Sequence, residues 1–460
     1  MNRVRPLLLA AIPLAILAFA WPADPANAAT RTVTNCNDAG TGSLRAAAAA
    51  ANSGDLIDLR GLTCPRIVLT SGAIRLPDQF ITIIGAGESR ITIDGNHASR
   101  VLEHTSTSWP LDNNATLRLR RLTVANGLDQ ENFGSGGCIL SRRHVRLEYA
   151  QVRDCVARGT APEGFGNAQG GGIFAAGRVI LFHAAVFGNR AEGGLDSEGG
   201  GVLAGDLLHV DHSSIHGNYS DGDAGGGTGR GSLFVTYSTI RDNAAMGNVG
   251  GINVSNGPAV INKSTISGNS ADHFGAAGSF SSGYPVTISD STISGNRTLR
   301  SPAGLGLDGR SSQVRVVNST IVDNIAAAPF FDLAVGGVEQ DGTVDYQSTI
   351  IANNFVGTTP QDLWAAVGFG ARVIGANNLI EASNAPLPAD TIGDDPMLAP
   401  LADNGGRTRT HALLAGSPAI DSGNNGGGFA DDQRGPGFAR VVGPRADIGA
   451  FEIQAPKPQP

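Results

Sequence analysis

The sequence is poor in aromatic residues and in helical patterning. Phe, Trp and Tyr make up 5% of the 460 residues, whereas hydrophobic residues make up 41%. The apolar content is too high for a disordered chain and sufficient for a large core. Apart from one short Ala-rich stretch, no segment has the apolar spacing of an amphipathic helix. This argues against leucine-rich, ankyrin and βαβ architectures.

Short motifs of common enzyme classes are also missing. The sequence has no Gly-x-Ser-x-Gly, His-Glu-x-x-His, Walker or dinucleotide-binding motif. Its four cysteines lack CxxC spacing and are too scattered for a zinc site. In an exported chain, proximity in sequence favours disulfides between Cys36 and Cys64 and between Cys138 and Cys155, although two other pairings remain possible.

The sequence is rich in glycine, with 64 residues, and it contains a repeated short motif. Between Leu122 and Asn354, an aliphatic residue, two variable positions and Asn recur every 25 to 34 residues, with Cys155 once in the Asn position. Val-, Ile- and Thr-rich runs lie between these signals, and clusters such as Gly170-Gly-Gly172 punctuate them. The repeated asparagines are Asn126, Asn189, Asn218, Asn243, Asn269, Asn296, Asn324 and Asn353.

This period predicts an all-β chain that forms one right-handed parallel β-helix from about Leu56 to at least Asn353, with ten or eleven coils. Asn tolerates the left-handed conformation of a tight corner, and stacked amides bond from coil to coil. We therefore expect the Asn series on a single corner as a structural ladder. A row that binds a ligand is the alternative interpretation.

The first 29 residues resemble a signal peptide. Arg3 and Arg5 precede the apolar run from Leu7 to Ala20, and Ala26-Asn-Ala28 suits cleavage. We expect Sec export to the periplasm, the cell surface or the medium. Cleavage removes two arginines and one aspartate, which changes the formal net charge from −8 to −9. An acidic exported chain is a poor nucleic-acid binder. We expect no transmembrane span in the mature chain, and the sequence leaves the oligomeric state open.

The remaining chain divides into four regions. Residues 30–121 are expected to form an N-terminal cap and the first coils, including a helix from Gly42 to Asn52 that Ser43 caps and Gly54 ends. Repeats follow over residues 122–376. Residues 377–453 form a C-terminal region, and residues 454–460 form a Pro-rich tail. No sorting motif, terminal helix or barrel-sized segment follows Glu452.

Both ends resemble a known family. Cys36-Asn-Asp-Ala-Gly-Thr-Gly-Ser-Leu-Arg45 is similar to the head of bacterial right-handed β-helix surface proteins of the CSLREA or polymorphic-outer-membrane type. Gly416-Ser-Pro-Ala-Ile-Asp421, Asp432-Gln-Arg-Gly435 and Asp447-Ile-Gly-Ala-Phe-Glu452 resemble the choice-of-anchor Q domain. The head lacks the Cys and Glu of that motif. The resemblance implies a pectin-lyase-like solenoid at the cell envelope, but it names no ligand.

Three acidic clusters are candidate sites. Asp211 and His212 are candidate catalytic residues, although strand alternation would place their side chains on opposite sides. Asp221 and Asp223 lie in a Gly-rich turn and could hold Ca²⁺, the only cofactor that the sequence suggests. Asp394-Asp395 and Asp431-Asp432 are further carboxylate pairs, and Asp432 could equally form a structural ion pair with Arg434.

The sequence therefore favours a protein of binding or adhesion, whose partners would be polysaccharides or cell-envelope components. A polysaccharide lyase or glycoside hydrolase on the same fold is the first alternative, and a structural stalk is the second. The choice depends on whether charged side chains from consecutive coils converge in one groove, which the loop lengths conceal.

Overall fold

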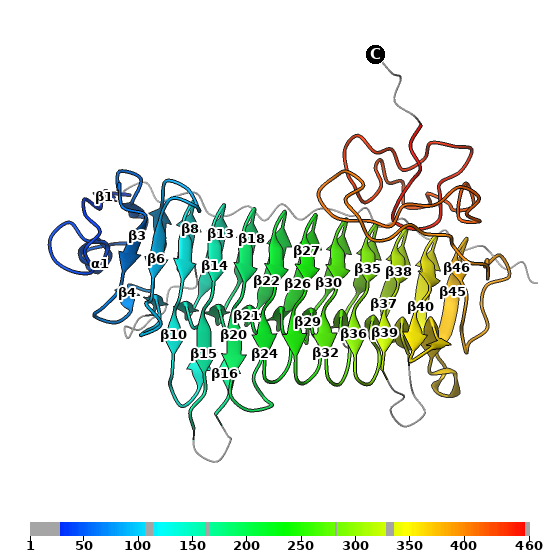
Figure 1. Cartoon of the computed structure of the whole chain (residues 1–460), viewed down its shortest axis with the longest axis horizontal. Helices are drawn as coiled ribbons and strands as arrows, with labels where there is room; N and C mark the ends of the chain where they lie inside the picture. Colours follow the sequence, from blue (N-terminus) through cyan, green and yellow to red (C-terminus); the bar gives the residue numbers. More distant parts are fainter. Residues whose placement is uncertain (1–27, 106–113, 162–165, 281–282, 328–334, 456–460) are drawn as a thin grey trace, which may run out of the picture.

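The chain forms one long parallel β-solenoid of about 12 turns with almost no helix (Figure 1). This computed structural model describes residues 28–105, 114–161, 166–280, 283–327 and 335–455. The predicted all-β solenoid is confirmed, and it has slightly more coils than the repeats alone indicated. The predicted signal peptide, except for its last two residues, and most of the Pro-rich tail lie outside the described residues.

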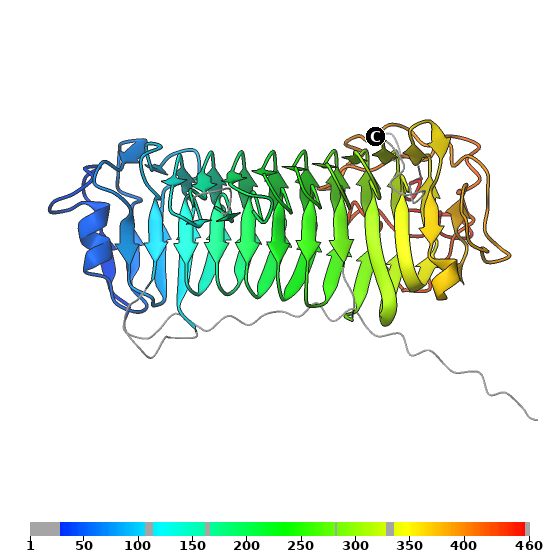
Figure 2. The same ribbon diagram turned by 90° about the horizontal axis from the view of Figure 1, so that it is seen from below.

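Three parallel sheets run along the solenoid, and each coil contributes to them in turn (Figures 1 and 2). Sheet A contains β1 (Thr30–Thr32), β2 (Leu56–Asp58), β4 (Ile74–Leu76), β5 (Ile81–Ile84), β7 (Leu102–His104), β8 (Thr116–Arg120), β12 (Ile139–Ser141), β13 (His144–Glu148), β17 (Ile173–Ala175), β18 (Val179–Phe182), β21 (Val202–Ala204), β22 (Leu207–Asp211), β25 (Gly227–Gly229), β26 (Ser232–Thr236), β29 (Ile252–Val254), β30 (Ala259–Asn262), β33 (Gly278–Phe280), β34 (Val286–Ser289), β37 (Leu305–Val317), β40 (Val338–Gln347), β44 (Leu363–Ala365) and β45 (Arg372–Ala376).

The other two sheets are built from shorter strands. Sheet B contains β3 (Arg66–Val68), β6 (Thr92–Asp94), β9 (Thr123–Ala125), β14 (Gln151–Arg153), β19 (Ala185–Phe187), β23 (Ser214–His216), β27 (Thr239–Arg241), β31 (Thr265–Ser267), β35 (Thr292–Ser294), β38 (Thr320–Val322), β41 (Ile350–Ala352) and β46 (Leu379–Ile380). Sheet C contains β10 (Leu128–Asp129), β15 (Val156–Arg158), β20 (Arg190–Glu192), β24 (Tyr219–Ser220), β28 (Ala244–Ala245), β32 (Ser270–Ala271), β36 (Arg297–Thr298), β39 (Ile325–Ala326), β42 (Phe355–Val356) and β43 (Thr359–Pro360). A separate pair is β11 (Gly134–Ser135) with β16 (Ala168–Gln169).

A short helix and a disulfide close the amino-terminal end. Helix α1 (Leu44–Ala49) is shorter than the predicted segment from Gly42 to Asn52, and it ends well before Gly54. The Ser43 hydroxyl caps it by accepting a hydrogen bond from the Ala46 amide at 3.2 Å. Leu44 is fully buried against the first coils. The predicted disulfide between Cys36 and Cys64 joins this end to the first coils, and Cys138 pairs with Cys155 within the core. The only other helical element among the described residues is η2 (Val367–Phe369).

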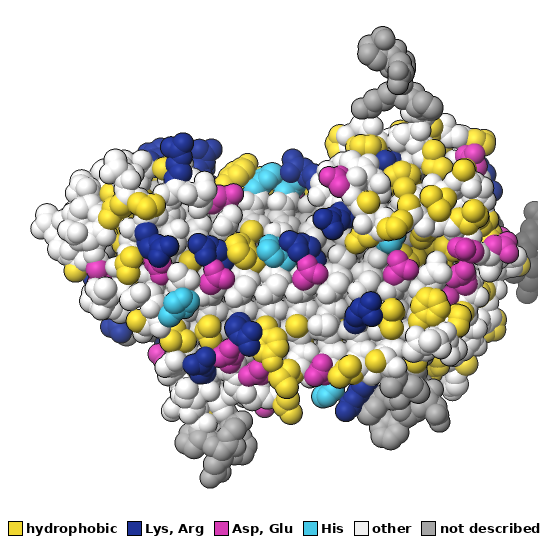
Figure 3. Space-filling model, in the orientation of Figure 1, with side chains coloured by type: hydrophobic (Ala, Val, Ile, Leu, Met, Phe, Trp, Pro, Cys, Tyr) yellow, Lys and Arg dark blue, Asp and Glu magenta, His cyan; other side chains and the backbone are white. Residues whose placement is uncertain are grey.

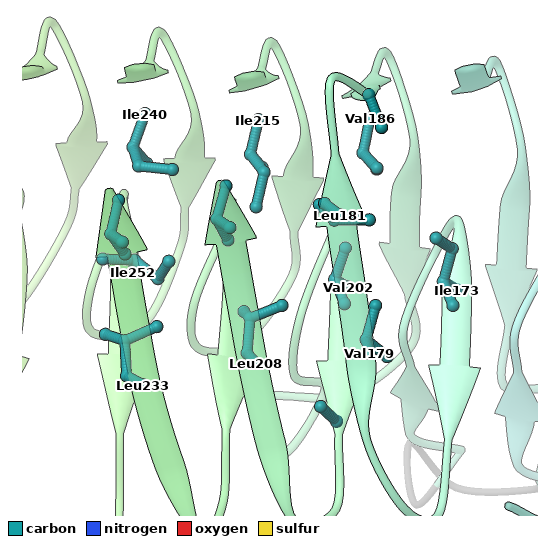
Figure 4. Packing of buried hydrophobic residues seen from close by; sticks show 14 of the residues in the cluster. Ile173, Val179, Leu181, Val186, Val202, Leu208, Ile215, Leu233, Ile240 and Ile252 are labelled. Atoms are coloured by element: carbon teal, nitrogen blue, oxygen red, sulfur yellow. The ribbon is translucent and has the colours of Figure 1, made fainter. Parts of the chain in front are cut away.

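The core is a stack of like side chains. Leu208 pairs in register with Leu233, and Ile215 with Ile240, and all four are fully buried (Figure 4). The strands alternate, so that in β26 Leu233 and Val235 point inward while their neighbours are partly exposed. Burial of each such side chain contributes about 2 kcal/mol. The interior is thus one continuous apolar column rather than separate domain cores.

The asparagines form a ladder on the corner between sheets B and C, as the sequence predicts. Each amide oxygen accepts from the backbone and side-chain amides of the preceding coil, at 2.8–3.1 Å. The ladder residues are Asn189, Asn218, Asn243, Asn269, Asn296, Asn324 and Asn354. Cys155 takes the ladder position one coil before Asn189.

Two of the predicted ladder positions are wrong by one residue. Asn126 and Asn353 stand one position earlier, with φ of 56° and 55°, where most other coils have Gly or Asp. Strand pairing shows the shift, since Thr320 aligns with Ile350 and not with Thr349. Gly127 and Asn354 therefore hold the ladder positions of those coils. Asn suits both positions, which is why the repeated phrase does not fix the register.

His104 gives the amino-terminal coils a predicted dependence on pH. Its ring is fully buried, with Nδ1 2.9 Å from Ser141 Oγ and Nε2 2.8 Å from Gln79 O. Burial lowers the pKa of His104 to about 4, although the hydrogen bond to Gln79 O opposes this shift. Because the unfolded chain binds this proton more readily, the free energy of unfolding falls as pH drops from 6.5 to 4, by about 3 kcal/mol.

The measurement is urea unfolding of the native chain and of His104→Gln across that pH range. Other titrating groups are common to both proteins, so the difference between the two curves isolates His104. Curves that remain parallel from pH 6.5 to 4 would contradict the assignment.

Candidate functional site

A row of side chains runs along the corner between sheets A and B. One residue per coil occupies it, each with φ between 44° and 52°, the left-handed region that bulky residues rarely adopt. The exposed part of this corner row consists of Arg121, Tyr149, His183, His212 and Tyr237. It continues through Lys263, Asp290, Asn318 and Ser348. Because the backbone conformation is shared, successive side chains leave the corner in the same direction.

A buried serine ladder accompanies this conformation. From His212 to Asn318, the residue after each corner residue accepts, through its hydroxyl, a hydrogen bond from a backbone N–H of the preceding coil. Ser238 Oγ accepts from the Ser213 amide at 3.0 Å, and Ser264 Oγ from the Ser238 amide at 3.1 Å. The ladder hydroxyls belong to Ser213, Ser238, Ser264, Ser291 and Ser319. The recurrent Ser-Thr-Ile triplets were its signal in the sequence, and the residue before the triplet is the corner residue, except that the triplet at Ser348 begins with the corner residue itself.

The four rings of the corner row stack evenly along the solenoid. Ring centroids lie 4.8 Å apart from Tyr149 to His183, 5.0 Å from His183 to His212 and 4.9 Å from His212 to Tyr237. The interplanar angles are 5°, 26° and 26°. Since the ring faces meet each other, solvent meets the ring edges, which carry the Tyr hydroxyls and the imidazole nitrogens. The sequence showed none of this arrangement, because the four residues are far apart in the chain.

These rings lie in an open groove of about 730 Å³. Gln151, Ser214 and Thr239, on the outward side of sheet B, line it beside the corner row. The turn at residues 86–88 and Arg407 also line it. Figure 3 shows the molecule hollowed along its upper edge, between the amino-terminal coils and the C-terminal part, with His side chains in the hollow.

The C-terminal lobe, residues 393–455, covers the later coils of the same face (orange to red in Figure 1). Thr265 Oγ1 donates to Arg409 O at 2.7 Å, and Thr292 Oγ1 donates to Gln433 Oε1 at 2.6 Å. An apolar contact joins Val322 and Ile350 of sheet B to Leu413, Ala419 and Ile448 of the lobe. The groove is the stretch of this face that the lobe leaves open.

Lys263 anchors the lobe at the groove's end. Its Nζ donates to the backbone oxygens of Asp431 at 2.6 Å and Asp432 at 2.5 Å, and lies 3.9 Å from Asp290 Oδ2. Asp290 is completely buried, and burial raises its pKa to about 6 despite the cations of Lys263 and Arg440. Gly435 packs against the ring of Tyr237, so close that a Cβ there would lie 2.9 Å from the ring.

The two candidate catalytic residues meet in this region. The sequence predicted opposite sides for them, but β22 ends at Asp211, and the left-handed turn at His212 brings its Nδ1 to 2.7 Å from Asp211 Oδ1. The imidazole therefore keeps Nε2 for another partner. Burial, His212 and Arg407 lower the pKa of His183, which Asp211 partly offsets. Burial and then Asp431 raise the pKa of Tyr237.

The structure places the other predicted site residues away from the groove lining. Asp221 Oδ2 accepts from the Gly193 amide at 2.8 Å, and Asp223 Oδ1 accepts from the Asn248 amide at 2.6 Å. Across residues 28–455, leaving out the undescribed gaps, no group of three or more His, Cys, Asp or Glu could hold a metal. A calcium role for this pair stays a prediction.

The carboxylate pairs of the C-terminal region lie within the lobe. Asp432 forms the structural ion pair with Arg434, at 2.6 Å and almost completely buried. Asp395 Oδ1 accepts a hydrogen bond from the Met397 amide two residues later. Arg434 also lies over the rings of Phe438 and Phe451, at 4.1 and 3.9 Å from their centroids. This cluster stabilises the lobe and lines no part of the groove.

Comparison with known proteins gives a match to one family model over part of the chain and a distant structural neighbour. The family model described as "Right handed beta helix region" matches residues 145–321. The crystal structure of pectate lyase Pel9A is similar over 93% of this chain and 97% of that chain, with 15% sequence identity and a TM-score of 0.39. No curated protein matches. The fold is that of a right-handed parallel β-helix, as the sequence predicts.

The helices of this fold are short. Within the part of the chain that the structure describes, none is long and apolar enough to cross a bilayer.

Proposed function

We propose that this protein is an exported binding protein and that the groove along the corner row holds an extended glycan chain. The observation that carries the proposal is the even stacking of four rings, at 4.8 to 5.0 Å, in an open groove. A sugar residue advances an extended polysaccharide by a similar length. Successive sugars can therefore meet equivalent groups on successive coils.

The chemistry of the lining supports the same ligand class. Ring edges present two phenolic hydroxyls and two imidazoles, and Gln151, Ser214 and Thr239 add an amide and two hydroxyls. These groups both donate and accept hydrogen bonds, as the hydroxyls of a sugar require. The lobe at Tyr237 and the turn at residues 86–88 bound the groove, so it fits a short stretch of a long chain.

The ends of the chain support an envelope location. The head and tail motifs resemble the CSLREA and choice-of-anchor Q family, and the first 29 residues have the pattern of a signal peptide. Two disulfides are compatible with export. We therefore place the binding role at the cell surface, in the periplasm or in the medium.

Removing either tyrosine ring weakens binding by about tenfold, because each ring supplies a fixed hydrogen-bonding edge. The variants are Tyr149→Asn and Tyr237→Asn, since Asn keeps the left-handed corner, as it does at Asn318. Calorimetry with pectin, alginate, xylan and cellulose oligosaccharides measures the affinity. His216→Asn is the matched control, because His216 stacks on Phe187 in the neighbouring row, outside the groove lining.

Equal affinity of the tyrosine variants and the native chain for a bound glycan would show that the glycan binds outside this groove. Absence of binding to the whole panel would overturn the proposal.

The bond between Asp211 and His212 favours a second candidate, a polysaccharide lyase or hydrolase, because a carboxylate that orients an imidazole can support proton transfer. Hydrolysis normally uses two carboxylates, and Glu88 is the one carboxylate among the described lining residues. We expect no turnover of pectin or alginate with Ca²⁺ present. Product release that Asp211→Asn abolishes would replace the binding role with catalysis.

A further inference from the structure

We infer that the ligand of the groove is an acidic glycan, whose carboxylates are held between Arg121 and Arg407 and along the stacked pair His183 and His212, and that its binding strengthens as pH falls. This rests on the proposed function and specifies the chemical class of its ligand.

The first support is that two arginines of the groove have no carboxylate as an ion-pair partner among the described residues. Arg121 and Arg407 are both exposed and line the groove. Among the described residues, neither has an acidic side chain within ion-pair distance, and the guanidinium of Arg121 lies 6.0 Å from the Tyr149 ring. By contrast, Arg153 and Arg241 in the neighbouring row of sheet B each pair with the next aspartate, at 2.5 Å. Unpaired guanidinium groups in a groove are ready to bind carboxylates in a bidentate manner.

The second support is the charge balance of the lining. Arg121 and Arg407 supply two positive charges, and Glu88 supplies one negative charge. With both imidazoles neutral the lining has a formal charge of +1, and Asp211, which is bound to His212 beside the lining, brings the groove to 0. With both imidazoles protonated the same groups sum to +2. The whole chain has −8, so the groove is less negative than the rest of this acidic protein and becomes positive when the imidazoles are protonated. Such a region attracts an anion that the rest of the surface repels.

The third support is the stacked histidine pair. The centroids of His183 and His212 are 5.0 Å apart, so two protons on the pair repel each other in the free protein. The surrounding charged and titratable groups are Asp211 from β22, Arg407 and Asp431 from the lobe, and the two tyrosines of the row. Arg407 and His212 disfavour the proton of His183, and Asp211 favours it. A ligand carboxylate at the ring edges offsets this repulsion.

The direction of the pH effect follows by linkage. A bound anion raises the pKa of His183 in the complex above its pKa in the free protein, which burial, His212 and Arg407 already hold below the ordinary value. Binding therefore takes up protons, is tightest below the free-protein pKa, and weakens as pH rises through the pKa of the complex. Neutral sugars gain nothing from the same protons.

The test compares polygalacturonate and alginate with their carboxyl-reduced, neutral forms at pH 5 and pH 8 and fixed ionic strength. Calorimetry on the native chain should show the acidic forms binding about tenfold more tightly than the neutral forms at pH 5, with most of that advantage lost at pH 8. Arg121→Asn and Arg407→Gln should each remove about tenfold in affinity for the acidic forms. Arg75→Gln, on a side chain of sheet A that is 84% exposed, is the control.

The histidine contribution is read from proton uptake. His183→Asn should reduce the protons taken up on binding, measured in buffers of different ionisation enthalpy, whereas His216→Asn should leave uptake unchanged. Equal binding of acidic and reduced glycans, or an affinity independent of pH, would overturn this inference while leaving glycan binding in place. No binding of either form would overturn the proposed function as well.

Discussion

Replacing Asn269 by Leu is expected to lower the free energy of unfolding by more than about 3 kcal/mol. Asn269 is fully buried, and its side-chain amide donates to Ile240 O at 3.1 Å and to Asn296 Oδ1 at 2.9 Å. Its oxygen accepts from the backbone and side-chain amides of Asn243. Leu makes none of these bonds, so buried polar groups on the two neighbouring coils each lose a partner. Each such group costs about 1–3 kcal/mol.

The matched control is Asn353→Asp. Asn353 belongs to the same repeated phrase but stands one position before the ladder, where Asp323 stands in the preceding coil. Asp adopts the left-handed conformation as readily as Asn, so stability should change by less than about 0.5 kcal/mol. Chemical denaturation of both variants measures the difference. Equal stability of the Asn269→Leu variant and the native chain would show that the Asn ladder does not stabilise this fold.

Replacing Lys263 by Met is expected to release the C-terminal lobe from the solenoid, at a cost of about 3–5 kcal/mol. The Nζ of Lys263 supplies the hydrogen bonds to two backbone oxygens of the lobe and is the cation nearest Asp290. Without it, Arg440 remains 4.0 Å from the completely buried Asp290 carboxyl, whose pKa would rise further above about 6. A buried group that loses its cation is destabilising or takes up a proton.

Limited proteolysis of residues 393–455 and thermal unfolding detect this release. Adding Asp290→Asn to Lys263→Met should restore part of the lost stability, because it removes the uncompensated charge but leaves the two carbonyls without donors. Asp290→Asn alone should have a small effect, since it removes the desolvation cost of the buried carboxylate together with its attraction to Lys263. A lobe that resists proteolysis equally in the Lys263→Met variant would contradict the anchoring role.

The repeats predicted the solenoid because the same short phrase must return at every coil. They also predicted the Asn ladder, since stacking follows from one coil per repeat. Proximity in sequence, not the repeats, predicted the disulfide between Cys36 and Cys64. The repeats misplaced Asn353, because Asn suits both the left-handed position and the ladder position, and the choice depends on strand pairing. They also placed Asp211 and His212 apart, because alternation holds only within a strand and β22 ends between them.

The candidate groove shows where sequence information ends. Thr239 and Thr265 occupy the same position in the same Ser-Thr-Ile triplet, and they pair with each other in adjacent coils. Thr239 lines the groove, whereas Thr265 is buried and bonded to Arg409 of the lobe. Likewise, Tyr237 and Lys263 are consecutive in the corner row, but one faces the groove and the other lies beneath the lobe.

The sequence by itself determined the solenoid, its period and its internal ladders, because these depend on residues that recur at one spacing and meet their own copies. Only the tertiary structure decided which face is open. That depends on where the lobe, about 150 residues further along the chain than the groove, folds back onto sheet B, through contacts such as Thr292 with Gln433. Long-range contacts of this kind have no periodic signal, since each is made once between unlike segments.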